Sequence, residues 1–300
     1  MKNYWIIGDI HGEIGLLDRL LEQIHRFDPD LIVFLGDYID RGPHSREVID
    51  RISELETEVV RLMGNHEMMM LNAMEDMGYG HSPIELWYYN GGEATLQSFG
   101  FTSFFSFQTD MDPHYLAFFQ SLKMSHTIEL PGNLKILATH AGVSPFIPLS
   151  DQMNMGSFGE LNRYLLERQI DPEDSFLWVR DAFFGSTPDL WEGYLVVHGH
   201  TPVLKLKRFI SANGKRQFLF VENDLCIRKD ERSGQIVSMD IDSGSVISGR
   251  LSGLGLFVEN GDPEHPAIRM RSLTVSGEEI APRDLGLISG TNGKWTNGHY

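Results

Sequence analysis

Five short segments of the sequence carry the residue types that bind metal ions or transfer protons. They are Asp9-Ile-His11, Asp37-Tyr-Ile-Asp40-Arg41, Gly64-Asn65-His66-Glu67, His140-Ala-Gly and His198-Gly-His200. Any one of them alone is more often a turn than a metal site, but five in series are not expected by chance. Imidazole nitrogen with carboxylate and amide oxygen suits manganese, iron or zinc, whereas magnesium and calcium prefer oxygen alone. The residue types therefore predict a site for first-row divalent metals.

The candidate ligands are too many for one ion and divide into two groups. The first group is Asp9, His11 and Asp37. The second group is Asp37, Asn65, His140 and His200. A carboxylate that bridges two ions sets them ~3.5–4 Å apart, which is the spacing of two-metal hydrolases. His198 lies two residues before His200, and it could be a ligand, a partner of a ligand or a neutral strand histidine; we favour the partner role.

The net charge of such a site indicates the class of substrate. Two divalent ions bring four positive charges, of which Asp9 and Asp37 offset two and a bridging hydroxide a third. Arg41 adds positive charge, and so does Arg180 if the fold brings it near. The pocket is therefore expected to be cationic in an acidic chain, and a phosphate dianion fits it.

Each of the five segments follows an apolar run with the length of a strand. These runs are Asn3 to Gly8, Leu31 to Leu35, Val59 to Met63, Leu134 to Thr139 and Tyr194 to Val197. Apolar residues at helical spacing from Ile14 to Ile24, and a second helix predicted over 45–55, complete a βαβαβ pattern. This pattern predicts a parallel or mixed sheet with helices packed on it. Ligands bind outside the carboxyl ends of such strands, so the five segments are expected to meet in one pocket.

Composition excludes several classes of protein. The 300 residues are 41% hydrophobic, which is enough for a large core, and the formal net charge is −17, which disfavours coating of nucleic acid. No apolar run reaches the ~18–20 residues of a membrane span. The single cysteine, Cys226, cannot form an intramolecular disulfide and fits a reducing cytoplasm. Candidate catalytic residues begin at Asp9, so we expect no cleavable presequence before them.

The later part of the chain gives weaker signals. Helices are expected near 67–77, 113–122 and 159–169, and a loop over 144–159. Residues 206–222 are predicted to form a hairpin, because Asn213-Gly214 separates two β-prone runs. Five cations between 205 and 216 would make this hairpin basic, either rimming the pocket or simply solvated. We expect one strand over 268–275 and a loose tail from about 284.

The motifs together resemble those of a known family. Gly-Asp-Ile-His-Gly (8–12), Gly-Asp-Tyr-Ile-Asp-Arg-Gly (36–42), Gly-Asn-His-Glu (64–67), His-Ala-Gly (140–142) and Gly-His-Thr (199–201) look like the signature of the PPP-type, calcineurin-like metallophosphatases. Asn-Gly-Gly (90–92) and the Asp-Ser-Gly stretch near 240–244 resemble the bacterial and bacteriophage branch. The resemblance covers about residues 1–250, which we expect to form the catalytic domain, with 251–300 as a C-terminal extension.

The resemblance implies an α/β fold of two packed mixed β-sheets flanked by helices, and two metal ions, most often manganese, with iron or zinc as alternatives. It implies that His200 rather than His198 is a ligand. It also implies that His66, held by Asp40, is the general acid that protonates the leaving group. Arg41 and Arg180 would bind phosphate oxygens while a metal-bridging hydroxide attacks phosphorus directly.

The function predicted from this resemblance is a protein phosphatase acting on phosphoserine or phosphothreonine, and on phosphotyrosine as a further option. A symmetrical diadenosine-tetraphosphate hydrolase is the first alternative, because the same ions could cleave an anhydride. A non-catalytic metal- or phosphate-binding relative and a two-metal nuclease are the others. The expected partner is a phosphorylated protein or peptide, or a small phosphate ester, with no membrane involved.

Overall fold

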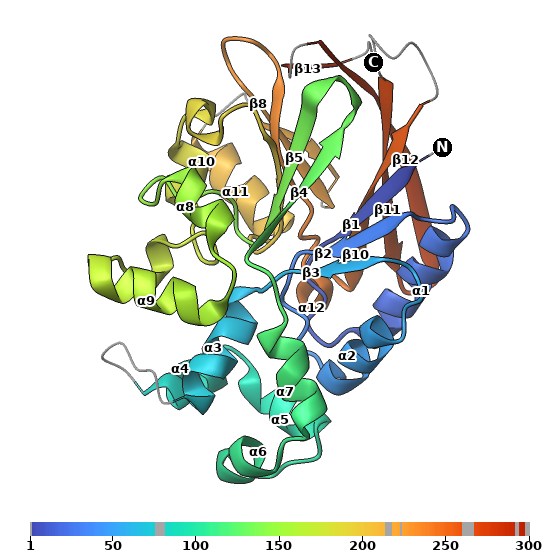
Figure 1. Cartoon of the computed structure of the whole chain (residues 1–300). Helices are drawn as coiled ribbons and strands as arrows, with labels where there is room; N and C mark the ends of the chain where they lie inside the picture. The colour runs from blue at the N-terminus through green and yellow to red at the C-terminus, as the bar shows by residue number, and fades with distance from the viewer. Residues whose placement is uncertain are drawn as a thin grey trace.

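Two β-sheets packed face to face form the centre of the molecule (Figure 1). The structure, a computed structural model, describes residues 2–75, 82–213, 218–222, 224–259, 267–291 and 294–297. Helices cover the outer face of each sheet. The predicted fold class, two mixed sheets flanked by helices, is confirmed.

The first sheet contains the amino-terminal strands and the last strands of the chain. Its order among the described residues is β13-β12-β11-β10-β1-β2-β3. The strands are β1 (Asn3–Ile7), β2 (Leu31–Phe34), β3 (Val59–Arg61), β10 (Arg250–Val258), β11 (Ala267–Ser276), β12 (Glu279–Thr291) and β13 (Lys294–Asn297). β1, β2 and β3 run parallel, whereas β10 pairs antiparallel with β1. The parallel strands are apolar along almost their whole length, as expected of strands buried on both faces.

The second sheet has the order β4-β5-β6-β9-β8-β7. Its strands are β4 (Ser125–Leu130), β5 (Leu134–Thr139), β6 (Leu195–His198), β7 (Phe218–Val221), β8 (Leu225–Lys229) and β9 (Ile236–Asp240). β5, β6 and β9 are parallel neighbours. Their apolar side chains, such as Ile136 and Val197, belong to one buried cluster with Ile6 and Val33 of the first sheet. This shared core holds the two sheets together.

The helices divide between the two sheets, and those from α4 to α7 lie beyond the ends of the strands rather than on a sheet face (Figure 1). Those associated with the first sheet are α1 (Ile14–His25), α2 (Ser45–Ser53), α3 (Asn65–Met74), α4 (Pro83–Tyr89), α5 (Gly92–Ser98), α6 (Phe104–Asp110), α7 (Pro113–Gln120) and α9 (Phe158–Arg168). Those on the second sheet are α8 (Leu149–Asn154), α10 (Asp181–Gly185) and α11 (Val203–Asn213), and α12 (Ser245–Ser248) precedes β10. No helix among the described residues is long and apolar enough to span a bilayer.

The structure corrects two local predictions in the middle of the chain. Residues 203–213 form helix α11 rather than the first strand of a basic hairpin, and the true hairpin is β7–β8. The helix forms because Val203 and Leu206, three residues apart, both bury on the second sheet, while Lys205 is exposed. The helical spacing of the apolar residues therefore predicted the structure of this segment better than the turn motif Asn213-Gly214 did. Residues 214–217 lie outside the described part of the chain. The predicted loop over 144–159 contains α8.

The predicted loose tail from residue 284 is wrong over most of its length. β12 continues to Thr291 and β13 follows it, because β11 offers a long edge whose backbone groups need partners. The predicted strand over 268–275 lies within β11. The division at residue 250 stays a prediction; it falls at the first residue of β10, which pairs with β1.

Candidate dimetal site

The carboxyl ends of β1, β2, β3, β5 and β6 bring the five predicted segments to one place. All six predicted metal ligands are buried: Asp9, His11, Asp37, Asn65, His140 and His200. Parallel strands of both sheets end there, so residues up to 191 positions apart touch directly. The prediction that the segments meet is therefore confirmed.

Asp37 lies at the centre of the site. Two groups of side chains could each hold a metal ion, His11–Asp37–His66 and Asp37–His140–His200, and Asp37 belongs to both. Its carboxylate oxygens lie 3.5 Å from His11 Nε2 and 3.4 Å from His140 Nε2. Burial alone would raise the pKa of Asp37, but the surrounding imidazoles hold it below its usual range.

Asp9 lies beside the two groups of side chains that could hold a metal ion. It belongs to neither group, and its two oxygens both accept the backbone N–H of His200 at 3.1 Å. Burial and the charges of Asp242 and Asp37 raise its pKa well above the usual range. The grouping of Asp9 with His11 and Asp37 around one ion therefore stays a prediction.

Three buried histidines each form a hydrogen bond between one ring nitrogen and a backbone carbonyl oxygen. His11 Nδ1 lies 2.8 Å from Ile39 O, His140 Nδ1 lies 2.9 Å from Leu35 O, and His200 Nε2 lies 3.0 Å from Trp178 O. Because a carbonyl oxygen only accepts, the facing ring nitrogen must donate. Burial lowers the pKa of all three histidines, so each is neutral and turns a lone pair toward the site.

Two of those lone pairs, on His140 and His200, face another acceptor. His140 Nε2 and His200 Nδ1 lie 2.9 Å and 2.8 Å from Asn65 Oδ1. Two acceptors at this distance repel each other unless a cation lies between them or the amide reverses. Carbonyl-oriented imidazoles of this kind are typical of metal ligands, since the second nitrogen sets ring direction and tautomer. The residues present therefore fit a divalent ion held by Asp37, Asn65, His140 and His200.

His66 stands beside this centre with a defined orientation. Its Nδ1 lies 2.7 Å from Asp40 Oδ2. Its Nε2 is buried, has no hydrogen-bond partner among the residues that the structure describes, and lies 4.0 Å from Asp37 Oδ2. Trp87 Nε1 donates to both Asp40 oxygens at 3.0 Å, and Thr95 Oγ1 donates to one at 2.6 Å. Asp40 is thus fixed from three sides and aims the free nitrogen of His66 into the site.

Trp87, Thr95 and Glu67 were not predicted as functional residues. Trp87 precedes the Asn-Gly-Gly motif, and any side chain on Gly92 would collide with its indole ring. That motif was therefore a usable signal for the aromatic residue that holds Asp40. Glu67 accepts the backbone N–H groups of Gly64, Asp37 and Tyr38 at 2.8–2.9 Å, which fixes the loop after β2 to the start of α3.

The backbone is strained at the same residues. His11, Asp37, Asp40, Arg41 and His200 all have φ between 50° and 71°, a region that residues other than glycine seldom occupy. Such conformations cost about 1–3 kcal/mol each and persist only where the surrounding structure imposes them. Five such residues at one site indicate that the fold accepts backbone strain there in order to position these side chains.

Both predicted arginines lie at the site. Arg41 Nη1 is 2.7 Å from His11 Nε2, and its backbone N–H donates to Gly91 O. Burial lowers the pKa of Arg180, which precedes α10, and the negative charge of Asp37 acts against that shift. Arg41 therefore contacts a predicted ligand directly, and Arg180 lies within reach of the Asp37 charge.

His198 points away from both groups of ligands. Its ring packs on Phe183 and Phe184 at centroid distances of 4.9 Å and 5.7 Å, and burial lowers its pKa to about 3. It is therefore a neutral strand histidine, and the role of a ligand's partner, which the sequence analysis favoured, is wrong. The structure places His200 rather than His198 in the ligand group.

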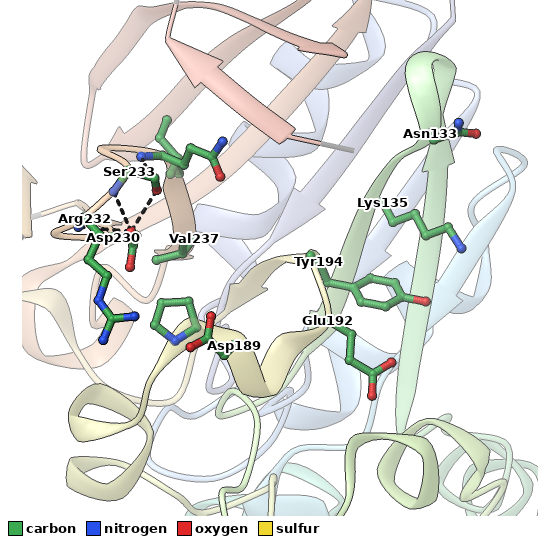
Figure 2. A pocket seen from close by; sticks show the side chains of 13 residues that line it. Asn133, Lys135, Asp189, Glu192, Tyr194, Asp230, Arg232, Ser233 and Val237 are labelled. Atoms are coloured by element: carbon green, nitrogen blue, oxygen red, sulfur yellow. Dashed lines mark hydrogen bonds between the residues drawn. The ribbon is translucent and has the colours of Figure 1, made fainter. Parts of the chain in front are cut away.

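A separate cavity of about 930 Å³ opens at the opposite ends of β5, β6 and β9 (Figure 2). Lys135 and Arg232 face it together with Asp189, Glu192 and Tyr194. None of the predicted site residues lines this cavity. Residues of both charges line this cavity, whereas the residues that could bind metal ions lie at the carboxyl ends of the strands.

Comparison with known proteins gives a family match. The sequence model described as calcineurin-like phosphoesterase matches residues 2–228. The serine/threonine-protein phosphatase 1 of Salmonella typhimurium is 42% identical over 94 residues, which cover 31% of this chain and 40% of that protein. A symmetrical bis(5'-nucleosyl)-tetraphosphatase of Coxiella burnetii is 32% identical over 146 residues, 48% of this chain and 43% of that protein.

These alignments span less than half the length of the curated relatives. A crystal structure of a metallophosphoesterase from Sphaerobacter thermophilus aligns over 95% of this chain and 88% of its own, with a TM-score of 0.37 and 15% identity.

Proposed function

Because this chain belongs to the calcineurin-like phosphoesterase family, we propose that it is a dimetal phosphomonoesterase that removes phosphate from phosphoserine or phosphothreonine in proteins or peptides. One observation supports this most strongly. Asp37 is shared by two groups of buried imidazoles, and the unpartnered Nε2 of His66 lies beside it. That arrangement provides adjacent metal positions and a proton donor.

Each part of the site has a proposed task. Asp37, Asn65, His140 and His200 would hold one ion, and Asp9, His11 and Asp37 would hold the other. We expect manganese, with iron or zinc as alternatives. Bound divalent ions lower the pKa of water toward ~7 and offset negative charge on the phosphoryl group.

The remaining residues bind the substrate and move the proton. Arg41 and Arg180 bind phosphoryl oxygens with their forked donors. His66 delivers a proton from Nε2 to the leaving oxygen, while Asp40 stabilises the positive charge that His66 carries before transfer. This proton matters because a serine or threonine alkoxide is a poor leaving group.

The symmetrical dinucleotide-polyphosphate hydrolase is the second candidate, and the Coxiella burnetii relative supports it. The two activities use the same catalytic groups and differ in the bond cleaved. The protein-phosphatase proposal is favoured because the phosphatase relatives have the higher identity, although over a shorter segment. The buried, unpaired Cys226 supports the further proposal that the protein acts in the reducing cytoplasm.

A single panel of substrates tests these proposals. We expect manganese-dependent release of phosphate from phosphoserine and phosphothreonine peptides, with kcat/KM above that for diadenosine tetraphosphate. The reverse order would assign the second activity. Failure to hydrolyse even an aryl phosphate, in protein shown to bind manganese, would contradict both and indicate a non-catalytic relative.

A further inference from the structure

The segment that carries Arg180 is attached to the candidate metal site on its amino-terminal side. Phe176 O accepts the backbone N–H of Ala141 at 3.1 Å, and Trp178 O lies 3.0 Å from His200 Nε2. Arg180 follows two residues later. Its side chain forms no hydrogen bond, and no ion pair within 4 Å, with any other residue that the structure describes. The position of its guanidinium therefore depends on how the backbone on both sides of Arg180 is held.

Helix α10 holds the backbone on the other side, because Arg180 is the residue directly before this helix. The ring of Phe183 in α10 lies against Gly142, where a Cβ would come within 2.8 Å of the ring, and it packs on the His198 ring at 4.9 Å. α10 thus rests on the two segments that supply candidate ligands from β5 and β6. The helix has only five residues, and a single turn is not stable by itself.

A buried arginine from β8 holds the far end of α10. Arg228 Nη1 donates to Phe183 O at 3.1 Å, and Nη2 donates to Ser186 O at 2.6 Å. Its guanidinium carbon lies 5.1 Å from the centre of the Trp191 ring and 5.8 Å from that of Phe218. Carbonyls at the end of a helix lack partners within it. The fork of Arg228 binds one carbonyl inside the helix and one just past its end.

Filling space does not require an arginine at this position. Arg228 is only 4% exposed and forms no ion pair within 4 Å with any acid in the described part of the chain. Burial lowers its pKa to about 10, so it remains charged at neutral pH. Burying an unpaired charge is costly, and an apolar side chain could pack on the neighbouring rings without that cost. The two carbonyls of α10 are therefore what explains the guanidinium.

We propose that Arg228 is a positioning residue for phosphate binding: by holding the end of α10, it fixes the place of Arg180. This inference rests on the proposed function, in which Arg180 binds phosphoryl oxygens. Arg228 belongs to neither group of side chains that could hold a metal ion. Its loss should therefore weaken the binding of phosphate and leave the binding of metal unchanged.

The test measures binding of inorganic phosphate to the manganese-loaded protein by calorimetry. We expect Arg228→Gln to lower phosphate affinity about 10-fold, because a displaced Arg180 loses much of a charged hydrogen bond. The stoichiometry and affinity for manganese should not change. Arg228→Lys keeps the charge but offers a single nitrogen in place of a fork, so its loss of phosphate affinity should be smaller. The lysine variant replaces Arg228→Gln if that protein does not fold.

A double variant separates positioning from general destabilisation. In an Arg180→Ala background, the Arg228 substitution should lower phosphate affinity no further, because the group that it positions is absent. Asp224→Asn is the matched control. Asp224 lies directly before β8 and pairs with Arg250, so its loss should destabilise the fold without changing phosphate affinity.

Unchanged phosphate affinity in the Arg228 variant would overturn the inference. Equal losses of affinity with and without Arg180 would also overturn it, and so would a loss of bound manganese. Wild-type protein that binds phosphate in an Arg228-dependent way but hydrolyses no phosphate ester would contradict the proposed function alone. Wild-type protein that binds manganese but no phosphate would contradict both.

Discussion

Buried acids at two places in this molecule are neutralised in different ways. Between the sheets, Asp224 is fully buried and accepts Arg250 Nε and Nη2 at 2.6 Å and 2.8 Å. Arg283 Nη1 donates to the same carboxylate at 3.1 Å, and its Nη2 lies 2.7 Å from the exposed Glu222. Each oxygen of Asp224 therefore has a cationic donor from the chain itself.

The candidate metal site lacks comparable pairing. Asp9 and Asp242 are equally buried, yet neither forms an ion pair within 4 Å with any described lysine or arginine. Asp37 is surrounded by imidazoles that burial keeps neutral. The comparison shows that the fold can pair a buried acid where its role is structural. At the site it leaves charge to be balanced by bound cations.

The largest effect is expected at Asp37. Asp37→Asn removes the carboxylate common to both groups of ligands, so activity should fall by about 10³-fold or more and most metal should be lost, since bound metal contributes several kcal/mol to transition-state stabilisation. Phosphate release and elemental analysis of the purified variant measure the two effects. Retained activity with two bound ions would show that Asp37 is not a bridge.

A substitution of His66 tests the proposed proton donor and leaves the metal-binding carboxylates unchanged. His66→Asn should slow hydrolysis of a phosphoserine peptide about 10²–10⁴-fold, because an alkoxide must be protonated as it leaves. An aryl phosphate needs little help, so its loss should be much smaller. Equal losses on both substrates would count against the acid role.

A substitution of Asp224 tests the structural role of its ion pairs with Arg250 and Arg283. Asp224→Asn should lower the free energy of unfolding by about 2 kcal/mol, since charged hydrogen bonds to two arginines are lost, while activity per folded molecule stays unchanged. Glu222→Gln is the control, and its exposed ion pairs are worth at most ~1 kcal/mol. Denaturant unfolding of both variants checks this; a loss of metal affinity in Asp224→Asn would remove the contrast between the clusters.

The smallest effect concerns pH in metal-free protein. Burial raises the pKa of Asp242 to about 7, so the folded state binds a proton that the unfolded state has released between about pH 4 and pH 7. This carboxyl therefore destabilises the folded state increasingly as pH rises through that range. Asp242→Asn should gain stability relative to wild type, by on the order of 2 kcal/mol more at pH 8 than at pH 5.5.

Unfolding of both chains in a metal chelator at the two pH values measures this difference. If the difference in unfolding free energy between the two chains does not change with pH, the pKa of Asp242 is not raised in the folded state.

Much of the site could be predicted because its signals are local. Apolar runs of four to six residues predicted the strands that precede Asp37 and His140, and the residue types that follow these strands predicted a metal site. The partners of Asp40 could not be predicted in this way: Trp87 and Thr95 lie 47 and 55 residues further on, and only their packing brings them to the carboxylate. Local signals also failed at α11, where a turn motif was given more weight than helical periodicity.

The sequence alone determined the elements and the chemistry of the strand ends, because periodicity, turn residues and ligand types act over a few positions along the chain. The tertiary structure decided which acids are neutralised and which are not. Asp9 and Asp242 meet only because two glycines let distant backbones touch, and Asp224 is satisfied only because β10 and β12 deliver arginines to it. Electrostatic balance depends on distances in space, which no local pattern of residues contains.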